Sequence, residues 1–241
     1  MRIVSWNLAH QTREDPIPAA LIPALSALRP DLLILNEFVD GPSRDALRSD
    51  LKALELHDIH VSQRVGTNNQ VLIASSVPLD PGDLRGPALI GGAAESNFLH
   101  VRMEGGALEV VGVRAPAYMP RQLNEYWTHL SALIRSTKDR SIIWIGDLNG
   151  DPDLPSSTGG KCLAKLREEG WQLPRATGAW SFHKGTRIDH VLASPSVPTV
   201  TAEYLASIGG VTVASGDRET RVSDHAALLA IIGPDASSLA S

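Results

Sequence analysis

Acidic and amide side chains follow several apolar segments of this 241-residue sequence, each where a strand would end. The most prominent case is Ser141–Asp151, in which the run Ile-Ile-Trp-Ile is followed by Gly-Asp-Leu-Asn-Gly-Asp. Asp147 and Asn149 are two residues apart, so on an extended backbone their side chains point the same way. Two polar side chains directly after a buried strand cost desolvation energy unless they hold a ligand, a metal or each other.

The same arrangement recurs along the chain, and its members share acidic, amide or imidazole chemistry. The set is Asn7, Glu37, Asp147 with Asn149, Asp189 with His190, and Asp224 with His225. If these positions converge, they form a pocket of hard oxygen ligands that suits Mg²⁺ or Mn²⁺, whereas zinc prefers several His or Cys ligands. A paired-His helix motif, a cysteine pair and a glycine-rich phosphate loop are all missing from the sequence, which argues against zinc hydrolases and P-loop or Rossmann nucleotide binding.

Such a pocket suits phosphoester hydrolysis, because negative charge accumulates on the phosphoryl oxygens and the leaving group in the transition state. A Mg²⁺ ion held by Glu37 offsets that charge. Asp147 is placed to position and deprotonate the attacking water, and Asn149 to donate to the water or the phosphate. His225, if Asp189 keeps it protonated, contacts a phosphoryl oxygen as a cation.

The elements that must position these residues alternate between helices and buried strands, with hairpins between them. This order predicts a mixed α/β fold with more than one strand layer, in the form of a pair of packed sheets. Helices are expected to begin at residues 15–16 or 22–23, and at residues 43, 120 and 159. Residues 77–94, rich in Pro and Gly, are expected to be loop. Strands are expected at residues 2–6, 32–35, 57–64, 70–76, 98–103, 107–113, 142–145, 180–182, 188–193, 200–205 and 226–232.

Composition favours one domain over residues 1–233, followed by a frayed C-terminal tail at 234–241, because no linker or composition break divides the chain. The hydrophobic content of 43% is enough for a sizeable core. With 22 basic and 27 acidic residues the net charge is −5, so nucleic-acid binding requires a local basic cleft. The single cysteine, Cys162, excludes an intrachain disulfide.

The sequence shows neither an apolar signal region after Met1 nor an apolar stretch of the roughly 20 residues that span a bilayer. We therefore expect a cytoplasmic protein without a membrane span, and a monomer.

Five short motifs in order across the chain resemble those of the endonuclease/exonuclease/phosphatase superfamily, which includes deoxyribonuclease I, exonuclease III and the apurinic/apyrimidinic endonucleases. The motifs are Ser5-Trp6-Asn7, Leu35-Asn36-Glu37, Gly146-Asp147-Leu148-Asn149, Arg187-Ile188-Asp189-His190 and Ser223-Asp224-His225. The resemblance implies a four-layer α/β sandwich, with two packed mixed β-sheets flanked by helices and the site at one end of the sheets.

The resemblance also implies a role for each motif residue. Glu37 would bind the Mg²⁺ or Mn²⁺ ion and Asp147 would handle the nucleophilic water. Asn7 and Asn149 would orient site groups, and Asp189 with His225 would act on the phosphate. Asp224 would be a second metal ligand or a carboxylate that stabilises the site.

The chain departs from the superfamily pattern at two positions that bear on the chemistry. Arg114 aligns where the superfamily has a Tyr or His that contacts the phosphate; a guanidinium binds phosphate but is no general acid near neutral pH. Arg114 is equally consistent with a surface or ion-paired arginine, and Tyr118 could substitute for the missing group. Ala9 stands where some nuclease members carry an acid, so one potential metal ligand is missing.

The segment Trp180–Lys184 is aromatic and basic, and a comparable loop contacts nucleic acid in the nuclease members. Trp180, Lys184 and Arg121 are therefore candidate substrate contacts, although Trp180 is equally consistent with a strand edge that faces the core. The histidines expected to be structural or solvated are His10, His57, His60, His100 and His129.

The predicted function is Mg²⁺-dependent hydrolysis of phosphodiester bonds, with DNA or RNA as the substrate. The alternative is a small-molecule or lipid-headgroup phosphatase or phosphodiesterase of the same fold. A third hypothesis, a binding module without turnover, is disfavoured because the motif carboxylates and His225 are all intact.

Overall fold

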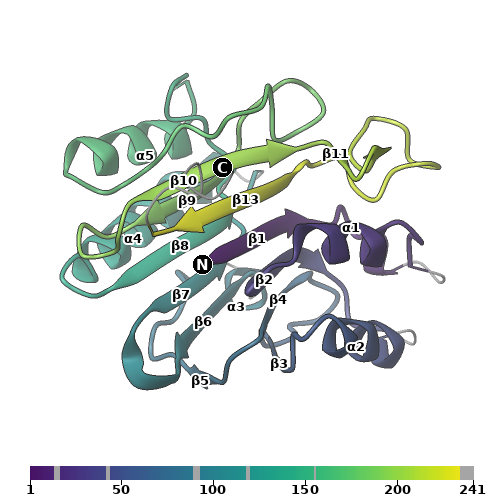
Figure 1. The fold of residues 1–241 in the computed structure, drawn as a ribbon. Coiled ribbons are helices and arrows are strands. Elements are labelled where there is room, and N and C mark those ends of the chain that lie inside the picture. The colour runs from purple at the N-terminus through teal and green to yellow at the C-terminus, as the bar shows by residue number, and fades with distance from the viewer. Residues whose placement is uncertain (14–16, 42–43, 89–92, 118–119, 155, 234–241) are drawn as a thin grey trace, which may run out of the picture.

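The computed structural model describes residues 1–13, 17–41, 44–88, 93–117, 120–154 and 156–233. Within these ranges a pair of mixed β-sheets packs face to face (Figure 1). Strands β1 and β2 are parallel, and the other neighbours in the first sheet are antiparallel. In sheet order its strands are β10 (Val200–Leu205), β13 (Ala227–Ile232), β1 (Arg2–Asn7), β2 (Leu32–Phe38), β4 (Gln70–Ser75) and β3 (Asp58–Val61).

The second sheet has one parallel pair, β7 with β8, and its other pairs are antiparallel. In sheet order its strands are β5 (Leu79–Pro81), β6 (Phe98–Met103), β7 (Glu109–Val113), β8 (Ile142–Asp147) and β9 (Asp189–Ala193). A separate short hairpin joins β11 (Ser207–Ile208) to β12 (Val211–Thr212).

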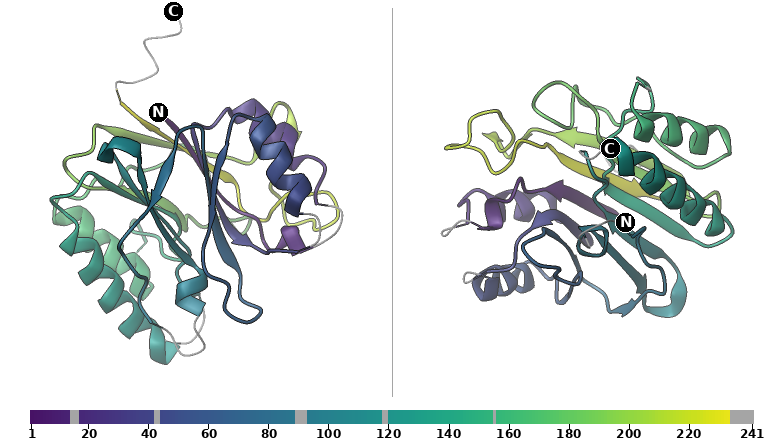
Figure 2. Two further views of the ribbon diagram at one scale, coloured as in Figure 1. Left: turned by 90° about the horizontal axis from the view of Figure 1, so that it is seen from below. Right: turned by 180° about the vertical axis from the view of Figure 1, so that it is seen from behind.

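Helices cover the outer face of each sheet. The helices α1 (Leu21–Leu28) and α2 (Arg44–Ala53) lie on the first sheet, and α4 (Pro120–Ser136) and α5 (Thr158–Glu168) lie on the second (Figure 2). The short elements are α3 (Ala93–Ser96), η1 (Gln11–Arg13) and η2 (Glu104–Gly106). The expected four-layer α/β sandwich is therefore confirmed.

The apolar run of β8 shows why this sequence forms a strand inside such a sandwich. Ile143 and Ile145 pack into the core between the two sheets, whereas Trp144 packs against the core beneath α4 and α5. Because both faces of the strand are covered, successive residues are all apolar and the polar alternation of a half-exposed strand is missing. The polar residues begin only at Asp147, where the strand ends.

Three expectations about elements were wrong or incomplete. Residues 77–94 are not all loop, because β5 pairs with the edge of β6. Residues 180–182 form no strand; the chain turns at Phe182, whose carbonyl accepts from the Gly185 N–H at 2.9 Å, so a ladder cannot continue there. The hairpin of β11 and β12 was not predicted, since two-residue strands leave no periodic pattern.

Helix α1 begins at Leu21, close to the later of the two expected starts, residues 22–23. Pro23 then lies in the first turn, where its missing N–H would have no helical partner in any case. The alternative start at residues 15–16 and the predicted cap at Ser43 lie outside the described residues. The tail at 234–241 does too, and the domain boundary at 233 stays a prediction.

Gly112 on β7 lies against side chains of the opposite sheet, and it yields a stability prediction. A Cβ added there would lie 2.8 Å from Val71 Cγ1 and 3.0 Å from Ile34 Cγ2, both in the opposite sheet. We expect Gly112→Ala to lower the free energy of unfolding by about 1–3 kcal/mol, because a close-packed interface must shift to admit a methyl group. Urea denaturation measures the change. Val211→Ala, at an exposed strand residue, is the control, and equal midpoints for the two variants would contradict the close approach.

Within the described part of the chain, none of the helices has the length and apolar character that crossing a membrane requires.

Candidate active site

The ends of strands from both sheets meet at one edge of the sandwich. The parallel pairs β1/β2 and β7/β8 end at this edge, and the antiparallel strands β9 and β13 begin there (Figure 1). A cavity of about 350 Å³ opens between these ends. The predicted site residues that line it are Glu37, Arg114, Asp147, Asn149, Asp224 and His225. Asn7 and Asp189 lie directly behind, hydrogen bonded to Asp147 and His225 respectively.

Glu37 is presented by an irregularity in β2. The pairing of β2 with β4 shifts register between Leu35 and Phe38, and Glu37 adopts a φ of 53°. Such a bulge redirects a side chain that regular pairing would leave in the sheet. The carboxylate is therefore directed into the cavity although its residue is only 6% exposed.

Asp147 ends β8, and the residue before it must be glycine. Gly146 has a φ of 145°, and a Cβ there would lie 2.1 Å from the Val113 carbonyl oxygen of the parallel strand. Both carboxylate oxygens of Asp147 accept hydrogen bonds: Oδ2 from Asn7 Nδ2 at 2.9 Å and Oδ1 from the Asn149 N–H at 3.1 Å. The side chain is thus fixed in one orientation at the cavity wall.

Burial dominates the protonation of Asp147. It raises the pKa of this carboxyl to about 7; Asp189 adds to the effect, whereas His225 and Arg114 oppose it. Asp189 is the direct cross-strand partner of Asp147 in the β8/β9 ladder, which explains why the two negative charges interact. A carboxyl group with a pKa near neutrality has the proton affinity that a general base requires.

Asn149 has a left-handed backbone, with a φ of 47°. Its Nδ2 donates to the Ala115 carbonyl at 2.7 Å, which joins the loop after β8 to the loop after β7. The side-chain oxygen therefore remains available to the cavity, and Asn149 holds the loop as well as lining the site.

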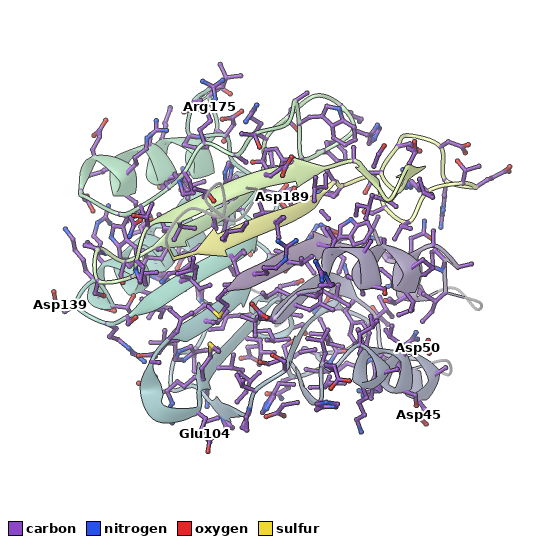
Figure 3. The ribbon with its side chains drawn as sticks, viewed as in Figure 1. Asp45, Asp50, Glu104, Asp139, Arg175 and Asp189 are labelled. Carbon is purple, nitrogen blue, oxygen red and sulfur yellow. The ribbon has the colours of Figure 1, made fainter. Side chains whose placement is uncertain are left out.

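His225 and Asp189 form a buried pair opposite Asp147. The His225 Nδ1 lies 2.8 Å from Asp189 Oδ2, and the backbone N–H of His225 donates to Ser223 Oγ at 3.0 Å. Figure 3 shows Asp189 within the body of the fold, whereas Asp139 and Arg175 lie at its periphery. Burial disfavours the imidazolium, but the charge of Asp189 and its hydrogen bond outweigh this and raise the pKa of His225 to about 9. A cationic imidazole therefore faces the cavity at neutral pH.

His190, which the sequence groups with Asp189, does not take part in the site. It is buried, and its Nε2 lies 2.8 Å from the Gly150 carbonyl and 3.0 Å from that of Arg187. Burial lowers its pKa, so this imidazole is a neutral structural donor.

Arg114 sits between the carboxylates of Glu37 and Asp147. Its Nε lies 2.8 Å from Glu37 Oε1 and 3.9 Å from Asp147 Oδ2, and its side chain is 20% exposed. Burial disfavours its charge, but Glu37 and Asp147 outweigh this and raise the pKa of the guanidinium above its ordinary value. Arg114 is thus an ion-paired arginine inside the cavity, and not a solvated surface residue.

The residues present fit a hard divalent cation. Glu37 and Asp224 supply carboxylate oxygens to the same cavity, and Asp147 supplies another at its wall. Burial and the charge of Asp189 raise the pKa of Asp147 more than His225 and Arg114 lower it. A divalent ion in the cavity would stabilise the ionised carboxylates, and an all-oxygen donor set is one that Mg²⁺ and Mn²⁺ prefer.

A second cluster of potential ligands lies at the opposite edge of the second sheet, where β7 begins. Atoms of Asp83, His100 and Glu109 lie within 4.8 Å of one another. Arg140 already pairs with both acids, and the Leu84 N–H donates to His100 Nδ1 at 3.1 Å. Since His100 Nε2 lies 2.9 Å from Glu109, both ring nitrogens of His100 already have hydrogen-bond partners within the protein. We interpret this cluster as a structural ion-pair network.

Two of the three residues predicted to bind substrate, Trp180 and Lys184, are not among the residues that line the cavity. Trp180 is partly buried and packs against the core between the sheets, which agrees with the core-facing alternative. Lys184 is exposed and lies over the Phe182 ring, 5.9 Å from its centroid. The side chain of Arg121 lies outside the described residues, as does Tyr118. Phe182 is the aromatic residue that lines the cavity, 5.0 Å between ring centroids from His225.

Sequence reasoning missed three polar residues that line the cavity: His10, Arg218 and Arg221. His10 was expected to be structural or solvated, yet its Nε2 lies 3.1 Å from Glu37 Oε2. Its place three residues after Asn7, beside the missing acid at Ala9, was a usable signal. Arg221 lies 3.5 Å from Asp224. Its position four residues before His225 in the sequence could likewise have indicated that it lies at the site.

Comparison with known proteins places these features in context. The chain resembles the solved structure of an AP endonuclease from Archaeoglobus fulgidus, with 17% identity and a TM-score of 0.67; the match covers 97% of this chain and 100% of that one. It also resembles the 3′ phosphatase NExo from Neisseria bound to product DNA hairpin, with 19% identity and a TM-score of 0.70 over 97% of this chain and 100% of that one. A third similar structure is beta toxin from Staphylococcus aureus, with 15% identity and a TM-score of 0.61 over 96% of this chain and 99% of that one. At these identities the likeness establishes the fold.

A search of curated proteins found no match. The model of the Endonuclease/Exonuclease/phosphatase family, in contrast, matches residues 4–225, which include all five motifs. The resemblance noted in the sequence is thereby confirmed, and the chain belongs to the endonuclease/exonuclease/phosphatase family.

Proposed function

We propose that this protein is a Mg²⁺- or Mn²⁺-dependent phosphodiesterase that cleaves nucleic acid. One observation carries the proposal: Glu37, Asp147 and the Asp189–His225 pair, from four different strand ends, surround a single cavity. Membership of a family named for endonucleases, exonucleases and phosphatases supports the same reaction class.

Glu37 would hold the metal ion, with Asp224 as a second carboxylate at the same cavity. The bound ion would supply Lewis acidity, which offsets the negative charge that develops on the phosphoryl oxygens. The protein residues perform the remaining tasks of positioning and proton transfer.

Asp147 takes the proton of the attacking water. The hydrogen bonds from Asn7 and from the Asn149 N–H fix its two oxygens, so that a lone pair points into the cavity in a constant direction. Since its pKa is about 7, the group is partly ionised at neutral pH and strong enough as a base to assist hydrolysis.

His225 and the arginines bind the phosphoryl group. With Nδ1 held by Asp189, the Nε2–H of the imidazolium donates to a phosphoryl oxygen. Arg114 contributes a guanidinium with donors beyond the Nε that faces Glu37, and Arg218 and Arg221 line the same cavity. A charged phosphoryl oxygen would thereby be bound from several sides of the cavity.

Phe182 supports nucleic acid as the substrate, because an aromatic face beside His225 offers a base a stacking partner worth about 1–3 kcal/mol. Hydrolysis of a small phosphoester is the second candidate. It is favoured by the net charge of −5, which provides no general attraction for a polyanion beyond the cavity arginines.

A substrate panel tests the proposal. Plasmid DNA, an abasic oligonucleotide, RNA and a chromogenic phosphodiester are incubated with the protein in Mg²⁺ or in EDTA. We expect metal-dependent cleavage of nucleic acid that Asp147→Ala abolishes. Turnover of a small phosphomonoester alone would favour the second candidate, and equal turnover by Asp147→Ala would contradict the assignment of the base.

Arg114 gives a further prediction for the same assay. Arg114→Met should lower kcat/KM by about 10–100-fold, because a charge-assisted contact with the phosphate is lost. It should also move the acid limb of the pH–rate profile to higher pH, since Arg114 lowers the pKa of Asp147. Arg135→Met, which breaks a surface ion pair with Glu169, is the matched control. An unshifted acid limb would show that Arg114 does not influence the base.

A further inference from the structure

His10 is brought to the cavity by a strained turn after β1. Ala9 and His10 adopt φ values of 47° and 62°, and neither residue is glycine. Consecutive left-handed residues of this kind persist only where the surrounding structure compensates for them. Here the Ala9 N–H donates to Asn7 Oδ1 at 2.9 Å, which ties the turn to the residue that also holds Asp147.

The orientation of the His10 ring is set by Asn69 in the turn before β4. His10 Nδ1 lies 3.0 Å from Asn69 Oδ1, an amide oxygen that can only accept, so Nδ1–H donates this hydrogen bond. In the tautomer that carries its hydrogen on Nδ1, the electron pair of the ring is on Nε2, the atom that faces Glu37. A histidine whose second nitrogen donates to an oxygen acceptor is the usual arrangement of a metal ligand.

The spacing between His10 and Glu37 suits two ligands of one ion. Nε2 of His10 lies 3.1 Å from Glu37 Oε2. Two neighbouring ligands of an octahedral ion, each about 2.1 Å from it, are about 3.0 Å apart. Arg114 is paired with the other oxygen, Oε1, so Oε2 is the oxygen of Glu37 that shares its surroundings with the imidazole.

We infer that His10 is a nitrogen ligand of the metal that Glu37 holds, in place of the acid missing at Ala9, and that it gives the site a preference for Mn²⁺ over Mg²⁺. The inference rests on the proposed function only in taking Glu37 as a metal ligand. An imidazole strengthens binding of Mn²⁺ and the later transition metals more than that of Mg²⁺, which takes oxygen ligands almost exclusively.

Mn²⁺ binding, followed by EPR without substrate, tests the inference. His10→Ala should weaken the Mn²⁺ Kd at least about 10-fold, while the Mg²⁺ Kd obtained by competition changes less than about 3-fold. Asn69→Ala should weaken Mn²⁺ binding to a smaller degree, because it removes only the group that orients the ring. Pulsed EPR of bound Mn²⁺ should detect a magnetically coupled nitrogen nucleus in the wild type that His10→Ala removes.

His57→Ala is the matched control, since His57 also lies 3.0 Å from a glutamate, Glu55, but on the exposed surface. Equal Mn²⁺ affinity in His10→Ala and His57→Ala, or a nitrogen signal that survives in His10→Ala, would overturn the inference.

Glu37→Gln separates this failure from that of the proposed function. If Glu37→Gln loses Mn²⁺ and His10→Ala does not, only the role of His10 is wrong; if Glu37→Gln also binds normally, the metal assignment itself fails. Thermal melting of each variant verifies that it folds.

Discussion

Asp147→Asn should lower kcat by about 10²–10⁴-fold, the usual contribution of a general base, while the protein remains folded. The same variant should change how stability depends on pH. The pKa of Asp147 is about 7 in the folded protein, against 3.8 without perturbation. Between these values the unfolded chain gives up the proton first, so the wild type loses stability as pH rises and levels off above about pH 7.

Chemical denaturation in EDTA at pH 5, 6, 7 and 8 measures this effect without a metal that would favour the carboxylate. Relative to Asp147→Asn, the wild type should lose about 1 kcal/mol per pH unit between pH 5 and 7. Asp153→Asn is the control, because Arg167 lowers the pKa of Asp153 and its titration is complete below this range. Parallel pH dependence of wild type and Asp147→Asn would show that Asp147 is ionised throughout.

Asp189→Asn should remove the charge that keeps His225 protonated. Burial then acts on the imidazole unopposed by Asp189, and the pKa of His225 should fall from about 9, although Asp147 and Asp224 still raise it. Activity at pH 8 should drop by about 10²-fold or more, and the alkaline limb of the pH–rate profile should move to lower pH. NMR titration of the His225 ring and the pH–rate profile give independent measurements.

The same pair also has a defined effect on stability. Because the folded pKa of His225 is raised, its stabilising contribution is complete below pH 6.5 and is lost as pH rises through about 9. Asp58→Asn is the matched control, since Asp58 pairs with His60 at 3.2 Å outside the cavity. If His225 still titrates near pH 9 in Asp189→Asn, Asp189 is not the cause of the shift.

Sequence predicts the features of this site that depend on strand ends. Asn7, Asp147 and Asp189 each lie at the end of a strand, and the apolar run next to each one shows where it enters the core. Their convergence follows from the layer architecture, because the parallel strands end where β9 and β13 begin. The five motifs then give the residue types, and the fold makes them neighbours.

The features that sequence does not predict depend on contacts between distant segments. Nothing local to His10 indicates that Asn69 will orient its ring, because β4 and the turn before it must first pair with β2. The register shift that turns Glu37 into the cavity likewise belongs to two strands together. At residues 180–182 the aromatic pattern suits a strand, but Phe182 ends up in the cavity and Trp180 against the core.

The pairing of β1 with β13 has a consequence for synthesis of the chain. The carbonyl of Asn7, at the end of β1, accepts a short hydrogen bond from Ser223 Oγ, and Arg2–Ser5 pair with Leu228–Ile231. Asp147 is therefore held by a residue of β1, the first strand to be made, whereas His225 directly precedes β13 and is made much later. A nascent chain that has not yet released β13 from the ribosome lacks one wall of the cavity and one neighbour of β1 in the first sheet. The cavity is thus complete only after β13 has emerged and paired with β1.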